Sequence, residues 1–189
     1  MSEAVSALPA ASYDGYVSVR EVGLQGMVTL RGDHATTPIK SAVKKVAGVD
    51  VPEAWRMSAK GQIGVAWMSP DELMVMGPYA DAPATVTAFE KALKGNHFLA
   101  VNVSDARAVF EISGPAVREV MAKLVPVDMS TQAFVPGQFR RTRMAQVAAA
   151  FWMLDEETIR IVCFRSVAEY VFGLLKDAAE PGSEVGFFG

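Results

Sequence analysis

The fold is decided by two similar stretches, MVTLRGD at Met27–Asp33 and VFEISGP at Val109–Pro115. Each is a short apolar run that ends in a turn and precedes a segment with apolar residues at helical spacing. Two later stretches also match: GVAWMSPDELMVMG at Gly64–Gly77 and AAAFWMLDEETIRIVCF at Ala148–Phe164 both have the pattern of an apolar hairpin with a polar turn. The offset of about 80 residues is too long for a solenoid repeat and suits two fused halves. The sequence therefore predicts a duplicated β-α-β-β-α unit of the α+β class.

Each half also contains helix signals. In the first half, one apolar face is formed by residues at helical spacing: Ile39, Ala42, Val43 and Val46. In the second half, Pro115 precedes a similar face, and Ser166 and Glu169 have the spacing of a capping box. We therefore expect two helices per half, packed on antiparallel sheets, with Ser166 capping the last helix.

The domain organisation follows from these repeats. We expect a flexible arm at residues 1–15, a single globular unit at 16–180, and a tail at 181–189. The globular unit would consist of two pseudo-repeats at about 16–97 and 98–180, because each sheet would leave one face uncovered if its half were isolated.

Composition narrows the functional classes. The net charge of -3 gives no electrostatic case for nucleic acid or an anionic membrane. Cys163 is the single cysteine and lies in an apolar run, so we expect a buried, inert thiol. The start of the sequence lacks the pattern of a signal peptide, and no apolar stretch reaches the ~20 residues that span a bilayer. A cytoplasmic protein is the simplest expectation.

The usual catalytic motifs are missing from the sequence. Neither G-x-G-x-x-G nor G-x-x-x-x-G-K occurs, and His34 and His97 have no cysteine ligands near them, so we expect no metal and no phosphate cradle. The basic cluster at Arg140, Arg141 and Arg143 fits a solvated strand face or partner-facing ion pairs better than a nucleic-acid track.

Seven polar residues at strand ends and helix starts remain as interface or structural candidates: Arg31, Asp33, Asp105, Arg107, Asp128, Arg165 and Ser166. Each is explained as a cap, a turn residue or a surface charge, and together they form no nucleophile, base and oxyanion set. We therefore expect no catalytic residue in this chain.

From about residue 16 to 180, the chain resembles the gamma subunit family of heterotetrameric sarcosine oxidase. The resemblance rests on the order and spacing of several motifs: Gly26–Asp33, Trp67–Val75, Asn102–Arg107, Ile112–Arg118, Pro126–Met129, Ala133–Phe134, Pro136–Gly137 and Arg165–Tyr170. The chain departs from the family pattern at Met129–Ser130, where Leu-His is expected, which argues against a ligand role for that loop.

The resemblance implies a fold related to the folate-binding aminomethyltransferase (glycine-cleavage T-protein) domain, with ferredoxin-like halves. It also implies alpha, beta and delta subunits as partners, in a complex that uses FAD, FMN, NAD and tetrahydrofolate while this chain alone binds none. The implied function is that of a non-catalytic subunit in the oxidation of sarcosine. The alternative is a free-standing folate-binding or one-carbon-transferring domain, for which Asp105 or Asp128 would have to serve as the pocket carboxylate or the general base.

Overall fold

Residues 3–188 are described by a computed structural model, in which the chain forms two compact units. The inserted unit consists of Leu24–Ser104, and the split unit combines the residues up to Gly23 with those from Asp105 onward. The division differs from the boundaries expected at residues 16 and 97. The reason is that the segment before Gly23 pairs with a strand of the second half rather than the first.

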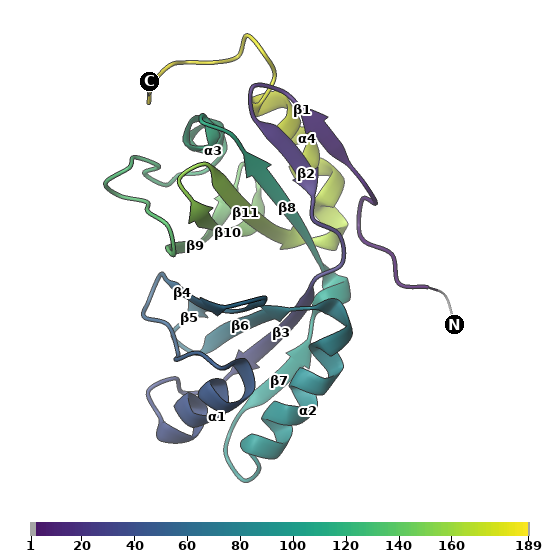
Figure 1. The fold of residues 1–189 in the computed structure, drawn as a ribbon, viewed down its shortest axis with the longest axis vertical. Helices are drawn as coiled ribbons and strands as arrows, with labels where there is room; N and C mark the ends of the chain where they lie inside the picture. Colours follow the sequence, from purple (N-terminus) through teal and green to yellow (C-terminus); the bar gives the residue numbers. More distant parts are fainter. Residues whose placement is uncertain (1–2, 189) are drawn as a thin grey trace. The chain divides into compact units, whose positions relative to one another are not determined.

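The inserted unit is a five-stranded antiparallel sheet with two helices (Figure 1). Its elements are, in order, β3 (Gly26–Arg31), α1 (Thr37–Ala47), β4 (Met57–Lys60), β5 (Ile63–Ser69), β6 (Glu72–Gly77), the 3-10 turn η1 (Tyr79–Asp81), α2 (Ala82–Ala92) and β7 (Leu99–Asn102). The strand order is β4-β5-β6-β3-β7, and α1 and α2 lie on the same side of the sheet (Figure 1).

The split unit is a six-stranded antiparallel sheet with two helices. Its elements are β1 (Ser12–Asp14), β2 (Ser18–Glu21), β8 (Arg107–Ser113), α3 (Val117–Leu124), β9 (Phe139–Met144), β10 (Val147–Asp155), β11 (Thr158–Phe164), the 3-10 turn η3 (Arg165–Val167) and α4 (Ala168–Ala178). The strand order is β1-β2-β8-β11-β10-β9. A further 3-10 turn, η2 (Ser104–Ala106), precedes β8.

The duplication is confirmed by the strand orders, because β4-β5-β6-β3 of one sheet matches β9-β10-β11-β8 of the other. Both hairpins carry a register shift just before their turn, at Trp67/Ser69 and at Met153/Asp155. The residue that follows β3 and the residue that follows β8 are both glycines. Each donates its amide to a backbone carbonyl of the hairpin turn: Gly32 to Asp71 at 3.0 Å and Gly114 to Glu157 at 2.9 Å. The α+β class with two antiparallel sheets is therefore as expected.

Each unit contains one more strand in the repeat than the sequence predicted, so the shared order is β-α-β-β-β-α. The additional strand is β4 in the inserted unit and β9 in the split unit, both at a sheet edge. Strand β4 (MSAK) is short and half exposed, so it lacks the alternation of apolar residues that signals a strand. Strand β1 falls within the segment for which no regular structure was predicted, and it pairs with β2.

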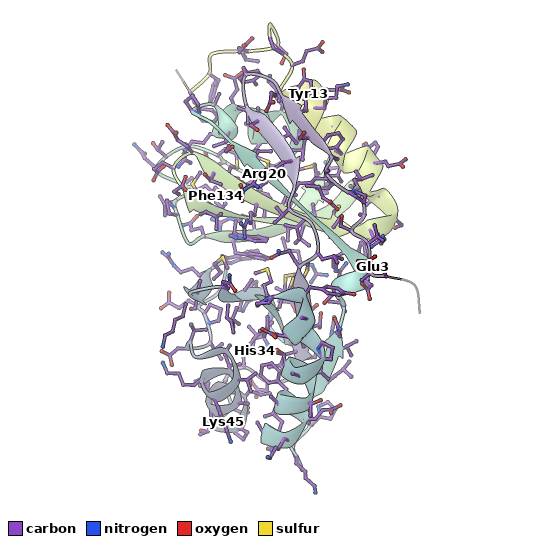
Figure 2. The ribbon with its side chains drawn as sticks, turned by 45° about the vertical axis from the view of Figure 1, so that its right-hand side comes forward. Glu3, Tyr13, Arg20, His34, Lys45 and Phe134 are labelled. Carbon is purple, nitrogen blue, oxygen red and sulfur yellow. The ribbon has the colours of Figure 1, made fainter. Side chains whose placement is uncertain are left out.

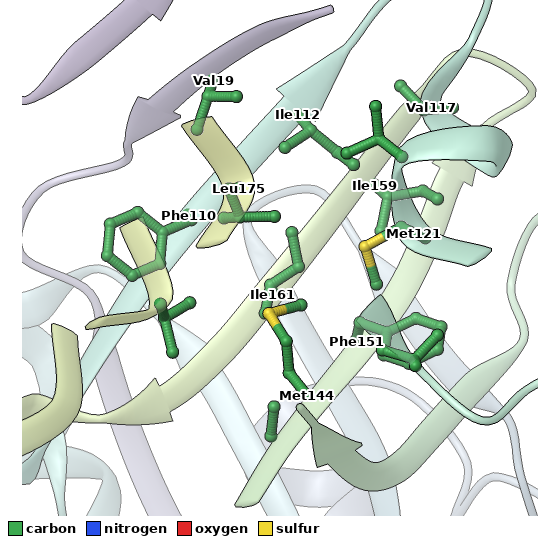
Figure 3. Close-up of a cluster of buried hydrophobic side chains, with 14 of the residues drawn as sticks. Val19, Phe110, Ile112, Val117, Met121, Met144, Phe151, Ile159, Ile161 and Leu175 are labelled. Carbon is green, nitrogen blue, oxygen red and sulfur yellow. The ribbon is translucent and has the colours of Figure 1, made fainter. Parts of the chain in front are cut away.

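The helices of each unit cover one face of their own sheet. In the split unit, Figure 3 shows side chains of α3 and α4, among them Val117, Met121 and Leu175, together with the strand residues Phe110 and Phe151. In the inserted unit, the corresponding core is built mainly from smaller side chains around Phe89: Val28, Leu30, Val43, Val65, Leu73 and Val75.

The prediction of a capping box at Ser166 is wrong. Ser166 lies in η3, helix α4 begins at Ala168, and the N-cap position is occupied by Val167 without a side-chain hydrogen bond. The backbone of η3 provides a hydrogen-bond acceptor for the start of α4, because the Ala168 amide donates to the Arg165 carbonyl. The Ser166 hydroxyl is therefore not needed as a cap. By contrast, α1 ends as expected at Gly48, whose φ of 72° is the left-handed conformation that a helix C-cap favours.

Candidate functional site

Arg31 and Asp33 fix the loop between β3 and α1. The Arg31 guanidinium donates to the Asp71 carboxylate at 3.2 Å and to the Glu72 carboxylate at 2.9 Å. Asp33 accepts the Ala35 amide at 2.9 Å through its own side chain, which forms a turn of the Asx type. Arg31 therefore ties the end of β3 to the β5–β6 turn, and Asp33 ties the loop to its own backbone.

His34 lies in the same loop and is buried (Figure 2). Neither of its ring nitrogens has a hydrogen-bond partner within the described part of the chain. Burial lowers the pKa of the imidazole, and the nearby Asp71 and Asp33 charges oppose that effect only partly. His34 is thus a neutral, buried ring at neutral pH.

Three of the candidates meet where β8 begins and β11 ends. Arg107 and Phe164 are paired across the two strands, and the Arg107 guanidinium lies 4.0 Å from the centre of the Phe164 ring. The next residue, Arg165, donates to the Ser6 carbonyl at 3.0 Å and so fastens the N-terminal segment. Asp105 is exposed in η2, just before Arg107.

Asp128 lies in the loop between α3 and β9, where it accepts the Ser130 amide at 2.9 Å. That hydrogen bond lowers the pKa of the Asp128 carboxyl. Because Asp128 is exposed and holds its own loop, its role is structural.

The same loop is organised by Arg118, which the sequence analysis did not single out. Arg118 is only 6% exposed. Its guanidinium donates to the backbone carbonyls of Met129 at 3.0 Å, Ser130 at 3.3 Å and Phe134 at 2.6 Å, and also to the carboxylate of Glu156. The sequence offered one sign that Arg118 is buried: it directly follows Val117, a residue of the apolar face of α3.

A second charged cluster crosses the split unit's sheet. Arg20 on β2, Glu111 on β8 and Arg160 on β11 are direct cross-strand neighbours, and both guanidiniums donate to the Glu111 carboxylate. Burial by itself would raise the pKa of Glu111, but the hydrogen bonds and charges of Arg20 and Arg160 outweigh it and lower the pKa. Glu111 therefore stays ionised and crosslinks three strands.

The basic cluster lies on the edge strand β9. Arg140 donates to the Gln138 side chain at 2.9 Å, and its guanidinium lies 5.4 Å from the centre of the Phe134 ring. Arg141 and Arg143 are exposed on the opposite face of the strand. Charges on an edge strand discourage uncontrolled pairing with other chains.

Cys163 is buried, as expected, and burial raises the pKa of its thiol to about 12. A thiol that holds its proton so strongly is a poor nucleophile and a poor metal ligand. Within residues 3–188, no three histidine, cysteine, aspartate or glutamate side chains are placed to hold a metal ion.

The inserted unit contains a small hollow beside its sheet that a cofactor would have to fit. Its lining comes from β3, α1, β5, β6 and the start of α2: Gly26, Val28, Val46, Ile63, Val75, Met76, Gly77, Pro78, Asp81, Ala82 and Thr85. The space is about 310 Å³ even with the open solvent at its mouth included. Ligand pockets begin at roughly 300 Å³ of enclosed volume, and this apolar lining has no basic side chain for a phosphate, so it fits neither a flavin nor NAD.

The candidate residues lie at separate places: Arg31 and Asp33 in one loop of the inserted unit, Asp128 in a loop of the split unit, and Arg107 and Arg165 at one end of the split unit's sheet. Arg31, Arg118 and Glu111 are used in ion pairs, Asp33 and Asp128 in backbone hydrogen bonds, and Arg107 in a cation–π contact. None of the helices formed by the described residues is long and apolar enough to cross a bilayer.

Several known proteins are similar to this chain. The model of the sarcosine oxidase, gamma subunit family matches residues 31–181. The chain is 28% identical to the sarcosine oxidase subunit gamma of Corynebacterium sp. (strain U-96), over 86% of this chain and 78% of that protein. It is 26% identical to the corresponding subunit of Arthrobacter sp., over 80% of this chain and 74% of that protein.

Solved structures give the same result. A chain in the heterotetrameric sarcosine oxidase from Corynebacterium sp. U-96, crystallised with pyrrole 2-carboxylate, matches with a TM-score of 0.80 and 26% identity, over 89% of this chain and 87% of that one. The glycine cleavage system aminomethyltransferase T from Bartonella henselae matches with a TM-score of 0.63 and 12% identity, over 85% of this chain and 46% of that one. The second match shows a shared fold, as the sequence resemblance implied.

Proposed function

Because this chain belongs to the sarcosine oxidase gamma subunit family, we propose that it is the gamma subunit of a heterotetrameric sarcosine oxidase. The observation that carries the proposal is the structural match along nearly the whole chain to one chain of such an oxidase. The family model covers residues from Arg31 to Pro181, which include most of both units.

The proposed role is structural. The partners would be the alpha, beta and delta subunits, and the complex would convert sarcosine to glycine with formation of hydrogen peroxide and 5,10-methylenetetrahydrofolate. FAD, FMN, NAD and tetrahydrofolate would be held by the other chains. In support, the Arg31 and Asp128 side chains are engaged in holding loops, and the hollow in the inserted unit does not fit a flavin or NAD. A cytoplasmic location is part of the same proposal.

The alternative, a free-standing folate-binding or one-carbon-transferring domain, is not favoured. It requires a carboxylate that can act on a bound pterin or one-carbon unit. Asp128 is exposed and is occupied by the Ser130 amide, and Asp105 is exposed in a turn. The aminomethyltransferase match, at 12% identity, supports a common fold and not a common activity.

Assembly tests the proposal. An affinity-tagged form of this chain is co-expressed with alpha, beta and delta subunits from the same organism, and the purified material is analysed by native mass spectrometry. We expect one copy of each subunit in the complex. Purification of a complete oxidase without this chain would contradict the structural role, and turnover of a folate one-carbon adduct by the isolated chain would support the alternative instead.

A further inference from the structure

The segment that follows α4, residues 180–188, is fixed against the split unit by side chains of α3. Both oxygens of the Glu119 carboxylate are used: one accepts the Val185 amide at 2.7 Å and the other accepts the Gly186 amide at 2.9 Å. Glu119 is only 7% exposed, and these backbone hydrogen bonds contribute to lowering its pKa. The carboxylate is therefore ionised and dedicated to this segment.

Lys123, one helical turn after Glu119, holds the beginning of the same segment. Its ammonium group donates to the Ser183 carbonyl at 2.6 Å, to the Ala178 carbonyl at 3.1 Å and to the Tyr16 hydroxyl at 2.9 Å. Tyr16 in turn donates to the Ala178 carbonyl at 3.0 Å. Four backbone groups at and after the end of α4 are thus bound by two side chains of one helix.

These contacts leave apolar side chains in solvent. Phe188 packs on the core of the split unit, whereas Phe187 is 78% exposed and Val185 is 70% exposed. The Phe187 ring meets the Phe188 ring edge-on, with 4.9 Å between centroids, so its direction is also fixed. Phe187 and Val185, unlike Phe188, therefore contribute little buried apolar surface to that core.

The charge of the segment has one sign. Residues 177–188 include Asp177, Glu180 and Glu184, and neither lysine nor arginine occurs among them. A surface that accepts Phe187 and Val185 therefore needs an apolar pocket with basic residues at its rim, because complementary charges favour and orient association.

We propose that residues 180–188 are a docking segment that inserts Phe187 and Val185 into an apolar, basic-rimmed pocket of another subunit in the complex. This inference rests on the proposed function, since it requires an assembly of several chains. Prior ordering by Glu119 and Lys123 lowers the backbone entropy that is lost on docking. A central aromatic anchor supplies the contact energy.

The test measures binding of this chain to the co-purified alpha, beta and delta subunits by biolayer interferometry. Phe187→Ala combined with Val185→Ala should weaken binding by about tenfold or more, the loss typical of an aromatic anchor. The matched control is Tyr170→Ala, which removes another exposed aromatic side chain of the same unit and should leave the affinity within about twofold. Thermal unfolding of each variant verifies that the fold is intact.

A charge-reversal variant tests the basic rim. Glu180→Lys should weaken binding more at low salt than at high salt, because screening removes the electrostatic contribution. Unchanged binding by the Phe187→Ala, Val185→Ala variant would overturn the docking segment while leaving the proposed function in place. Unchanged binding by Glu180→Lys at low salt would overturn the basic rim. If the wild-type chain does not bind the other three subunits, the proposed function fails and this inference fails with it.

Discussion

The inserted and split units share one topology but differ in how they are stabilised. At matching sheet positions, the inserted unit has Val28 and Val65 where the split unit has Phe110 and Phe151. The inserted unit pins its first loop with an exposed arginine, Arg31, whereas the split unit buries Arg118 against three carbonyls. A duplicated fold therefore keeps its strand order while its cores and charged contacts diverge.

The two units also differ in the strand that lies beside the first strand of the repeat. The position beside β3 in the inserted unit is filled by the edge strand β7, whereas the position beside β8 in the split unit is filled by β2 from the N-terminal segment, with β1 as the edge strand beyond it. The split unit also holds the segment after α4 through Glu119 and Lys123. The split unit therefore holds both terminal segments of the described chain.

The largest expected contrast lies in the cores. Phe151→Ala should reduce the free energy of unfolding by about 3–5 kcal/mol, and Val65→Ala at the matching position by roughly half as much, because a smaller side chain leaves a smaller cavity. Urea unfolding followed by circular dichroism measures both. Equal losses would show that the larger side chain in the split unit contributes nothing additional.

The next contrast compares the two arginines. Arg118→Met should cost about 3 kcal/mol, because it leaves the carbonyls of Met129 and Phe134 without a donor in a buried site. Arg31→Met removes an exposed pair with Asp71 and a pair between the half-exposed guanidinium and the buried Glu72, and should cost less, about 1–2 kcal/mol. The same unfolding experiment applies, and a cost for Arg31→Met as large as that for Arg118→Met would contradict this distinction.

Acidification should release the segment after α4. Because the folded-state pKa of Glu119 is lowered, the stabilisation it provides is present above the unfolded pKa of about 4.3 and is lost as the pH falls through the folded value. The amide resonances of Val185 and Gly186 should therefore shift in NMR spectra at acidic pH. Glu119→Gln is the control, which should remove that titration; shifts that persist in this variant would assign the effect to another group.

The smallest effect is expected at Ser166. Since the structure shows no cap hydrogen bond from this residue, Ser166→Ala should change the free energy of unfolding by less than about 0.5 kcal/mol. A loss near 1 kcal/mol would restore the capping box that the sequence alone predicted.

The sequence was sufficient for the repeated elements because their apolar patterns are strong. The hairpins at Gly64–Gly77 and Ala148–Phe164 and the helix faces were found with nearly the right bounds, since buried strands and amphipathic helices leave a periodic signal. Edge strands such as β4 and β7 leave none, because one or both of their faces are exposed and only pairing with β5 or β3 makes them strands.

The roles of individual polar residues were harder to predict. Asp33 makes its contact within its own loop, whereas the contacts of Arg31, the buried contacts of Arg118 and the row formed by Arg20, Glu111 and Arg160 join residues distant in sequence. Such contacts depend on strand register and loop path, which local patterns do not encode. The capping-box prediction failed because the residues before α4 form the 3-10 turn η3, whose backbone takes the place of a side-chain cap.

The central claim is that this chain is a structural subunit of an oxidase. The most direct measurement is sarcosine-dependent hydrogen peroxide formation by alpha, beta and delta subunits expressed with and without this chain, with the Phe187→Ala, Val185→Ala variant as a third preparation. We predict full sarcosine-dependent activity only when this chain is present. A stable complex with full activity in its absence would contradict the account.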